Sequence, residues 1–228
     1  MIKEAIVLAG GLGTRLQSVI KDIPKPMADI KGEPFLKFLL NYLSSNGIER
    51  VILSVGYRHE VIEDYFGKKY KNIDLHYAIE DEPLGTGGGI MNALNYTQEN
   101  LVYLINGDTF FNIKLQELFD FHIQSQADFS LALKPMLQFN RYGTVELDKA
   151  RIFKFNEKEY KEEGLINGGI YILNKYLLET HNFPAKFSFE KDFLEKYLNL
   201  FFINGCVFDN YFIDIGVPED YQKAQYQL

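Results

Sequence analysis

The chain has 228 residues, with 24 Lys and Arg against 31 Asp and Glu, so its formal net charge is −7. Hydrophobic residues make up 46% of it and aromatic residues 15%, enough to bury a core, which excludes disorder as the main state. The acidic balance argues against nucleic acid as a partner. Because no linker-like stretch rich in Pro, Ser or Gly divides the sequence, we expect residues 1–228 to form one domain.

Strand-like and helical patterns alternate through the first half of the chain. The expected strands are 4–8, 50–55, 74–79 and 101–105, and the expected helices are 35–45, 60–66, 89–96 and 115–124. Each of these strands is a nearly continuous apolar run, which is typical of strands covered on both faces. The pattern therefore predicts a parallel α/β layout.

The second half of the chain is richer in strands. We expect strands at 129–134, 143–147, 152–155, 166–173, 202–208 and 212–215, a helix at 190–197 capped by Ser188, and a last helix that begins at Pro218. Polar turns and glycines separate several of these strands. This mixture predicts some antiparallel pairing within the same sheet.

The longest apolar runs are strand-sized and far short of the roughly 20 residues that cross a bilayer. Five apolar residues before Gly10 are too few for the core of a signal peptide. We therefore expect a cytoplasmic protein without a membrane partner. A single cysteine, Cys206, cannot form an internal disulfide and is expected to be a buried, inert thiol.

A glycine-rich turn follows the first expected strand. Gly10, Gly11 and Gly13 come directly after Leu8, at the place where open α/β sheets bind ligands. The dinucleotide fingerprint fits poorly because Leu16 stands where the third glycine belongs, which counts against a dinucleotide-dependent oxidoreductase. The residues that we expect to bind a nucleotide here are Leu8, Gly10, Gly11, Gly13, Thr14, Arg15 and Lys25. Glycine backbone and the two cations together predict a triphosphate cradle.

The motifs LAGGLGTRL at 8–16 and PKPM at 24–27 resemble the signature of the nucleoside-triphosphate:sugar-1-phosphate nucleotidyltransferases. LSVGY at 53–57, EPLGTGGGI at 82–90 and NGDTFF at 106–111 look most like the D-glycero-D-manno-heptose 1-phosphate guanylyltransferases within that family. The resemblance extends over essentially the whole chain. It implies a Rossmann-like, three-layer α/β nucleotidyltransferase domain with a predominantly parallel mixed sheet, a nucleotide pocket, a sugar-phosphate pocket and dependence on Mg²⁺.

The acidic and glycine-rich segment 80–89 joins an expected strand to an expected helix. Guanine presents two donors on one edge, and a carboxylate accepts both of them in a forked geometry. We therefore expect Glu80 to bind the base, with Gly85 and Thr86 lining the pocket. A solvated acidic turn is the alternative interpretation of this segment.

Two isolated acids, Asp108 and Asp214, follow or end expected strands. Carboxylates at neighbouring strand ends suit Mg²⁺, a hard cation that binds one or two carboxylates together with phosphate oxygens and water. The resemblance maps both residues onto the metal-binding aspartates of the family. It also implies Arg15, Lys25 and Asp108 as the catalytic residues. The four histidines lack metal-ligand spacing.

The sugar phosphate is assigned from the resemblance alone. It implies that Gly143 lets the sugar approach the backbone, that Glu157 accepts from sugar hydroxyls and that Lys158 meets the phosphate. The same resemblance places Asn167 and Glu190 against the sugar, although a helix-capping arrangement at Ser188 would explain that segment equally well.

The predicted reaction transfers GMP from GTP to a sugar 1-phosphate, in particular D-glycero-D-manno-heptose 1-phosphate, and gives a GDP-sugar and pyrophosphate for surface-glycan biosynthesis. Mannose-1-phosphate guanylyl transfer and N-acetylmuramate-1-phosphate uridylyl transfer are the alternatives within the enzyme class. A non-catalytic regulatory subunit that binds a nucleotide sugar is the alternative outside it. The aromatic content suits a core or a homo-oligomer interface equally well, which leaves assembly open.

Overall fold

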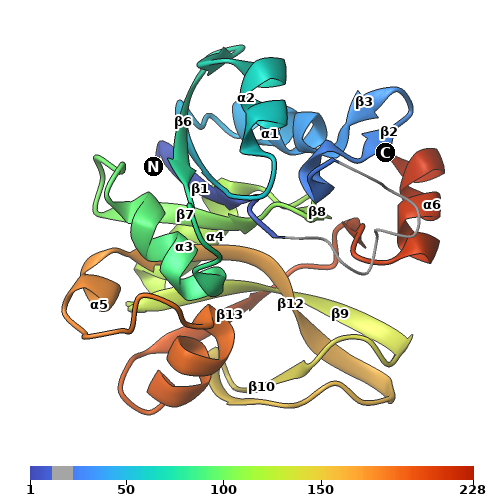
Figure 1. Ribbon diagram of the computed structural model, residues 1–228. Helices are drawn as coiled ribbons and strands as arrows, with labels where there is room; N and C mark the ends of the chain where they lie inside the picture. Colours follow the sequence, from blue (N-terminus) through green and yellow to red (C-terminus); the bar gives the residue numbers. More distant parts are fainter. Residues whose placement is uncertain (12–22) are drawn as a thin grey trace.

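The computed structural model describes residues 1–11 and 23–228. In chain order the strands are β1 (Glu4–Leu8), β2 (Asp29–Ile30), β3 (Glu33–Pro34), β4 (Arg50–Val55), β5 (Lys69–Tyr70), β6 (Ile73–Ile79), β7 (Leu101–Asn106), β8 (Thr109–Phe111), β9 (Phe129–Phe139), β10 (Thr144–Asp148), β11 (Arg151–Phe155), β12 (Lys161–Asn174), β13 (Ile203–Val207) and β14 (Phe212–Asp214). The helices are η2 (Lys25–Met27), α1 (Phe35–Ser45), α2 (His59–Phe66), α3 (Gly85–Leu94), α4 (Leu115–Gln124), α5 (Tyr176–Glu179), η3 (Phe189–Glu195) and α6 (Pro218–Gln227). Figure 1 shows their arrangement.

A ten-stranded mixed sheet forms the centre, in the order β10-β11-β13-β9-β12-β7-β1-β4-β6-β5. Parallel pairs join β7, β1, β4 and β6, and a further parallel pair joins β13 to β9. The other neighbouring strands of the described sheet pair antiparallel. The predicted mixed α/β fold is confirmed. Parallel pairing prevails only in the first half of the chain, because β12 runs antiparallel to both β7 and β9, and β10 and β11 form an antiparallel hairpin.

Successive side chains of the strands pack alternately into two separate hydrophobic cores. On β1, Ala5 and Val7 pack into one cluster with α1, α2 and α4, whereas Ile6 packs into the other with α3 and η3. Successive side chains of a strand point to opposite faces, so a run that is apolar throughout must be covered twice. The nearly continuous apolar runs of the sequence therefore correspond to a sheet enclosed between two helical layers.

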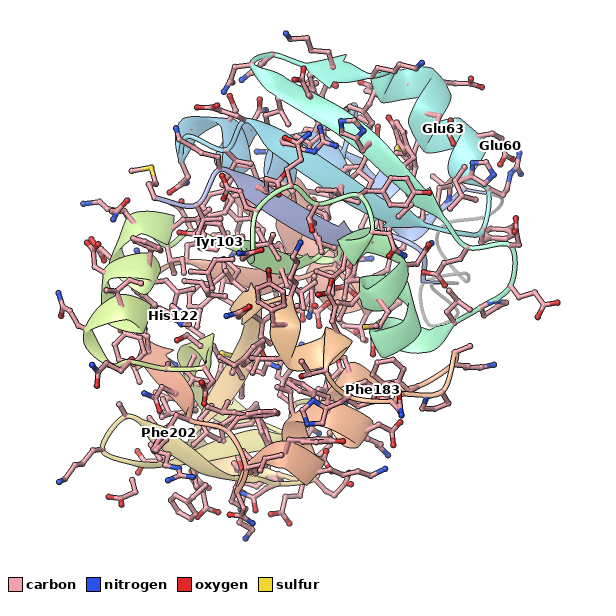
Figure 2. The ribbon with its side chains drawn as sticks, turned by 90° about the vertical axis from the view of Figure 1, so that its left-hand side faces the viewer. Glu60, Glu63, Tyr103, His122, Phe183 and Phe202 are labelled. Atoms are coloured by element: carbon pink, nitrogen blue, oxygen red, sulfur yellow. The ribbon has the colours of Figure 1, made fainter. Side chains whose placement is uncertain are left out.

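Buried polar groups tie α4 to the sheet. The Tyr103 hydroxyl on β7 donates to the carbonyl of Leu115 at 2.8 Å, and the His122 Nδ1 lies 2.8 Å from the Ser130 hydroxyl on β9. Figure 2 shows Tyr103 in the interior and His122 on α4. Burial raises the pKa of Tyr103 and lowers the pKa of His122. Both side chains therefore stay neutral at pH 7 and act as structural partners.

Several element bounds differ from the sequence prediction. Strands β9 and β12 extend beyond the expected 129–134 and 166–173, because they pair with each other over most of their length. Helix α3 begins at Gly85 and not at 89, so a row of glycines lies inside its first turns. Among residues 1–11 and 23–228, no helix is both long enough and apolar enough to cross a membrane.

The side chain of Glu4 anchors β1, the strand that leads into the first glycine turn. It is only 3% exposed, lies 3.1 Å from the Nε of Arg50 and accepts from the backbone N–H groups of Gln98 and Glu99 at 2.8 and 2.7 Å. Glu4→Ala leaves two amides and a guanidinium without their partner, so the free energy of unfolding should fall by about 2–4 kcal/mol. Urea denaturation measures this change.

Glu49→Ala is the matched control for that substitution. Glu49 also pairs with a cation, Lys3 at 2.7 Å, but its side chain is 61% exposed. Exposed pairs contribute roughly 0–1 kcal/mol. Equal losses for Glu4→Ala and Glu49→Ala would contradict the anchoring role of Glu4.

Candidate active site

A cavity of about 1220 Å³ opens at the carboxyl ends of β1, β4, β6 and β7. One wall comes from the residues that end these strands or follow them directly, namely Leu8 to Gly11, Ser54, Gly56, Ile79 to Asp81 and Asn106 to Thr109. The second wall comes from the second half of the chain, with Tyr142 to Val145, Phe155 to Lys158, Asn167, Tyr171, Ser188, Glu190 and Lys191. The volume exceeds the roughly 300–1,000 Å³ of a pocket for one small ligand. Two ligands can therefore lie in it side by side.

The cavity brings together the predicted site residues that the structure describes. Those that line it are Leu8, Gly10, Gly11, Lys25, Glu80, Gly85, Thr86, Asp108, Gly143, Glu157, Lys158, Asn167, Glu190 and Asp214. Gly13, Thr14 and Arg15 lie outside the described residues. The predicted nucleotide residues come from the first half of the chain and the predicted sugar residues from the second half, with Lys25, Asp108 and Asp214 also in the lining.

Strand pairing outside the main sheet joins the two acids. The short strands β8 and β14 pair antiparallel, with Thr109 opposite Asp214, and the Ile215 N–H donates to the Asp108 carbonyl at 2.9 Å. Lys25 Nζ lies 2.6 Å from Asp108 Oδ2. A side chain at Gly216 would meet Asp214 Oδ1 at 2.7 Å and Lys25 Nζ at 3.2 Å, so only glycine fits there without displacing these groups.

The electrostatics of this cluster favour an additional cation. Burial, followed by the charge of Asp108, raises the pKa of Asp214, and Lys25 only partly offsets this effect. Within the described part of the chain no three metal-ligating side chains gather, so protein ligation is limited to this carboxylate pair. Mg²⁺ is typically held by one or two carboxylates and completed by phosphate oxygens and water. The donor set therefore fits Mg²⁺ bound together with a phosphorylated ligand.

Glu80 is held in place at the opposite end of the nucleotide wall. Its Oε1 accepts from the Ser54 hydroxyl at 3.1 Å, and its Oε2 accepts from the Leu84 N–H at 3.1 Å. Each carboxylate oxygen has two lone pairs and can accept a second donor. The carboxylate is thus oriented by its neighbours and still able to bind a ligand. A side chain at Gly10 would approach Oε1 to 3.2 Å, so the first glycine turn packs closely against it.

The glycines of α3 serve internal packing more than ligand binding. A Cβ at Gly87 would lie 2.2 Å from the Phe187 ring, and one at Gly88 would lie 2.3 Å from the Ala185 carbonyl oxygen. Gly85 has a φ of +74° and its Cβ would meet the Phe187 carbonyl oxygen at 2.5 Å. Residues 185–189, here called the strap, therefore lie directly on the first turns of α3. Tertiary packing explains why this helix begins within a glycine run, despite the low helix propensity of glycine.

Sugar-side residues cluster on β12 and η3. The Asn167 side-chain amide donates to the Tyr171 hydroxyl at 2.8 Å, and its carbonyl oxygen accepts from the Gly169 N–H at 3.0 Å. Burial, followed by the charge of Glu190, raises the pKa of Tyr171. Asn167, Tyr171 and Glu190 thus form one polar corner of the cavity.

The loop side of the sugar wall is more open. Glu157 and Lys158 are exposed and line the cavity. A Cβ at Gly143 would lie 2.4 Å from the Asn156 carbonyl oxygen. Gly143 is therefore required by the packing of the loop after β11, in addition to any approach of a ligand.

Sequence reasoning did not single out Ser54, Tyr142 or Tyr171, and all three line the cavity. Ser54 is a polar residue within an apolar strand, a signal that could have found it. Tyr142 precedes a glycine in a turn, and burial and the Asp214 charge raise its pKa. Tyr171 lies inside an apolar strand and gives no such signal, because its hydroxyl reaches the cavity only when the strand is placed in the sheet.

The raised pKa of Asp214 has a consequence for stability. A carboxyl group whose pKa is higher in the folded state costs stability once it ionises, so at pH 7 the charge of Asp214 opposes folding. Asp214→Asn removes that charge and keeps an oxygen that accepts the Gly216 N–H, a bond of 2.6 Å. Thermal unfolding at pH 7 without divalent metal should show a higher midpoint for Asp214→Asn than for the wild type.

Asp220→Asn is the control with the opposite sign. Burial alone would raise the pKa of Asp220, but hydrogen bonds from Lys223 and Arg141 hold it below its ordinary value. Its charge therefore stabilises the fold at pH 7, and this contribution is lost as the pH falls through the folded pKa. Asp220→Asn should lower the unfolding midpoint. A lower midpoint for Asp214→Asn as well would contradict the destabilising effect of the Asp214 charge.

Comparisons with known proteins place this geometry in a family. The chain is 53% identical over 225 residues to the D-glycero-alpha-D-manno-heptose 1-phosphate guanylyltransferase of Aneurinibacillus thermoaerophilus, which covers 99% of this chain and 98% of that protein. The protein of the same name from Campylobacter jejuni is 51% identical over 219 residues, 96% of each chain.

A solved structure described as HddC from Yersinia pseudotuberculosis complexed with GMP-PN superposes with a TM-score of 0.89 at 41% identity, covering 98% of both chains. The family model for nucleotidyl transferase matches residues 4–228. This match covers nearly the whole chain. The chain belongs to the nucleotidyl transferase family.

Proposed function

We propose that this protein transfers GMP from GTP to D-glycero-α-D-manno-heptose 1-phosphate, giving GDP-heptose and pyrophosphate. The observation that carries the proposal is the identity of 53% and 51%, over nearly the full length, with two heptose 1-phosphate guanylyltransferases. The geometry supports it independently. A cavity large enough for two ligands has an acid pair and a lysine in its lining.

The reaction needs charge neutralisation more than proton transfer. An oxygen of the sugar phosphate attacks the α-phosphorus of GTP, the bond to the bridging oxygen breaks, and pyrophosphate leaves with the electron pair. Because the attacking phosphate oxygen is already ionised, a general base is not required. Catalysis then depends on holding the two anions in line and on stabilising the charge that develops in the transition state.

We assign these tasks to Lys25 and the acid pair. Lys25 would neutralise the triphosphate and the departing pyrophosphate, together with Arg15, which we assign on the sequence alone. Asp108 and Asp214 would hold Mg²⁺, which when bound screens the repulsion between the two phosphates. The ion pair between Lys25 and Asp108 keeps the ammonium group close to the acid pair.

We assign one substrate to each wall of the cavity. On the nucleotide wall, Glu80 faces the cavity with its carboxylate oriented by Ser54 and Leu84, suited to the paired donors of guanine. On the sugar wall, Asn167 and Glu190 would accept hydrogen bonds from ring hydroxyls, and Lys158 would meet the sugar phosphate. The nucleotide substrate points to the cytoplasm as the place of reaction, and a GDP-sugar product to surface-glycan synthesis as its use.

The test is pyrophosphate release in the presence of Mg²⁺, with GTP, UTP, dTTP, CTP and ATP each combined with heptose, mannose, glucose and N-acetylmuramate 1-phosphates. Release confined to GTP and heptose 1-phosphate is the expected result. Preference for mannose 1-phosphate would change the sugar, and preference for UTP would remove the base-binding role of Glu80. Nucleotide binding without turnover in every combination would favour a regulatory subunit instead.

Lys25→Ala tests the proposed charge neutralisation. Removing one preorganised charge from a transition state typically costs about 10²- to 10³-fold in kcat, and we expect a loss of that size. Single-turnover and steady-state kinetics with GTP and heptose 1-phosphate measure it.

Lys134→Ala is the matched control for Lys25→Ala. The side chain of Lys134 is 14% exposed, against 12% for Lys25, and it also pairs with an aspartate, Asp209, at 2.5 Å. Lys134 lies outside the cavity lining. Turnover by Lys134→Ala should stay within about twofold of the wild type. Similar kcat values for the two variants would exclude Lys25 from the chemistry.

A further inference from the structure

Thr86 makes two hydrogen bonds that connect the nucleotide side of the cavity to the sugar side. It lies in the first turn of α3, on the nucleotide side, yet its hydroxyl donates to Glu190 Oε2 at 2.8 Å. The same oxygen accepts from the Phe189 N–H at 2.9 Å. Both partners belong to η3, more than 100 residues later in the chain. The only hydroxyl proton of Thr86 is therefore used within the protein, which leaves the side chain no donor for a base.

The contact is built into the fold by the strap, residues 185–189. The Gly87 N–H donates to the Phe187 carbonyl at 3.0 Å, and the Phe187 N–H donates to the Leu84 carbonyl at 3.1 Å. Phe183 stacks on Phe187 with ring centroids 4.6 Å apart and also contacts Phe193 of η3 edge to face. Figure 2 shows Phe183 beside this helix. Aromatic packing and backbone bonds thus hold the start of η3 against the start of α3.

Glu190 is oriented by this arrangement. Its Oε2 accepts from the hydroxyl of Thr86 and from that of Ser188, the latter at 3.1 Å. Within the described part of the chain, Oε1 is the oxygen left to meet a ligand. Glu190 lines the cavity and its charge reaches Tyr171, whose hydroxyl accepts from Asn167. The carboxylate therefore faces the sugar-side corner, although one of the groups that fix it comes from the nucleotide side.

We propose that Thr86 is a positioning residue for the sugar 1-phosphate, acting through Glu190, and not a contact to the base. The inference rests on the proposed function, in which Glu190 accepts from the sugar ring. It reverses the assignment expected from the sequence, where Thr86 lies within the base-binding segment. A hydrogen bond to a charged group contributes more than one between neutral groups, so its loss should be measurable as a change in sugar affinity.

Thr86→Val removes the hydroxyl and keeps the shape of the side chain. We expect the KM for heptose 1-phosphate to rise about tenfold, while the KM for GTP stays within about twofold of the wild type. Thr86→Ser restores the hydroxyl and should restore the sugar KM. This split between the two substrates separates positioning from a general loss of structure, which would affect both.

Thr97→Val is the matched control for Thr86→Val. Thr97 follows the other end of α3, and its hydroxyl donates to the Leu94 carbonyl at 2.8 Å. It lies outside the cavity lining, so this variant should keep both KM values.

A double-mutant cycle tests whether Thr86 acts through Glu190. Glu190→Ala should raise the sugar KM by itself, and Thr86→Val added to Glu190→Ala should raise it no further. Additive effects would show that Thr86 acts by another route and would overturn the proposal. A rise in the GTP KM with an unchanged sugar KM would also overturn it and make Thr86 a base contact.

The activity of the wild-type protein distinguishes a failure of this proposal from a failure of the proposed function on which it rests. A wild-type protein that releases no pyrophosphate from GTP and any sugar 1-phosphate overturns the proposed function and the role of Thr86 with it. An active wild type whose sugar KM is unchanged by Thr86→Val overturns the role of Thr86 alone.

Discussion

The pairing of β8 with β14 is the constraint on which the site depends. These short strands lie outside the main sheet, yet they bring Asp108 and Asp214 together from positions 106 residues apart in the sequence. Lys25 approaches from a third segment, and Gly216 leaves the space that the ammonium group and the carboxylate need. Burial, together with the neighbouring charge of Asp108, raises the pKa of Asp214. A site with two carboxylates and one ammonium group favours a cationic ligand, together with the phosphates that accompany it.

The main sheet sets where this cluster can lie. Parallel strands β7, β1, β4 and β6 end at one edge, so the turns that follow them meet there. The second half of the chain returns through antiparallel strands and supplies the facing wall. Because β12 lies between β7 and β9, the polar residues Asn167 and Tyr171 reach the cavity from within this strand. One sheet therefore carries both halves of a two-substrate cavity.

Close packing between α3 and the strap joins these halves. Gly85, Gly87 and Gly88 have no room for a Cβ, because Ala185 and Phe187 occupy the space. The glycine run thus serves as a docking surface for another part of the chain. Thr86 and Glu190 complete that contact with a hydrogen bond that links the nucleotide wall to the sugar wall. Rigid positioning of this kind is valuable for a reaction between two anions, whose rate depends on alignment.

The sequence by itself determined the longer strands and helices of the first half, the edge of the sheet at which the cavity lies and many of the residues that line it. Apolar runs of strand length, broken by glycine turns, leave few other folds, and the described members of the predicted site all line one cavity. Only the tertiary structure decided which partners those residues have. Protein atoms occupy the space that a Cβ would need at Gly87 and Gly143. Thr86 bonds to Glu190, and Tyr171 lines the cavity. All of these features depend on contacts between segments that are separated in the sequence. Local patterns carry periodicity and turn chemistry, whereas such contacts follow from strand register and from the close packing of side chains across layers.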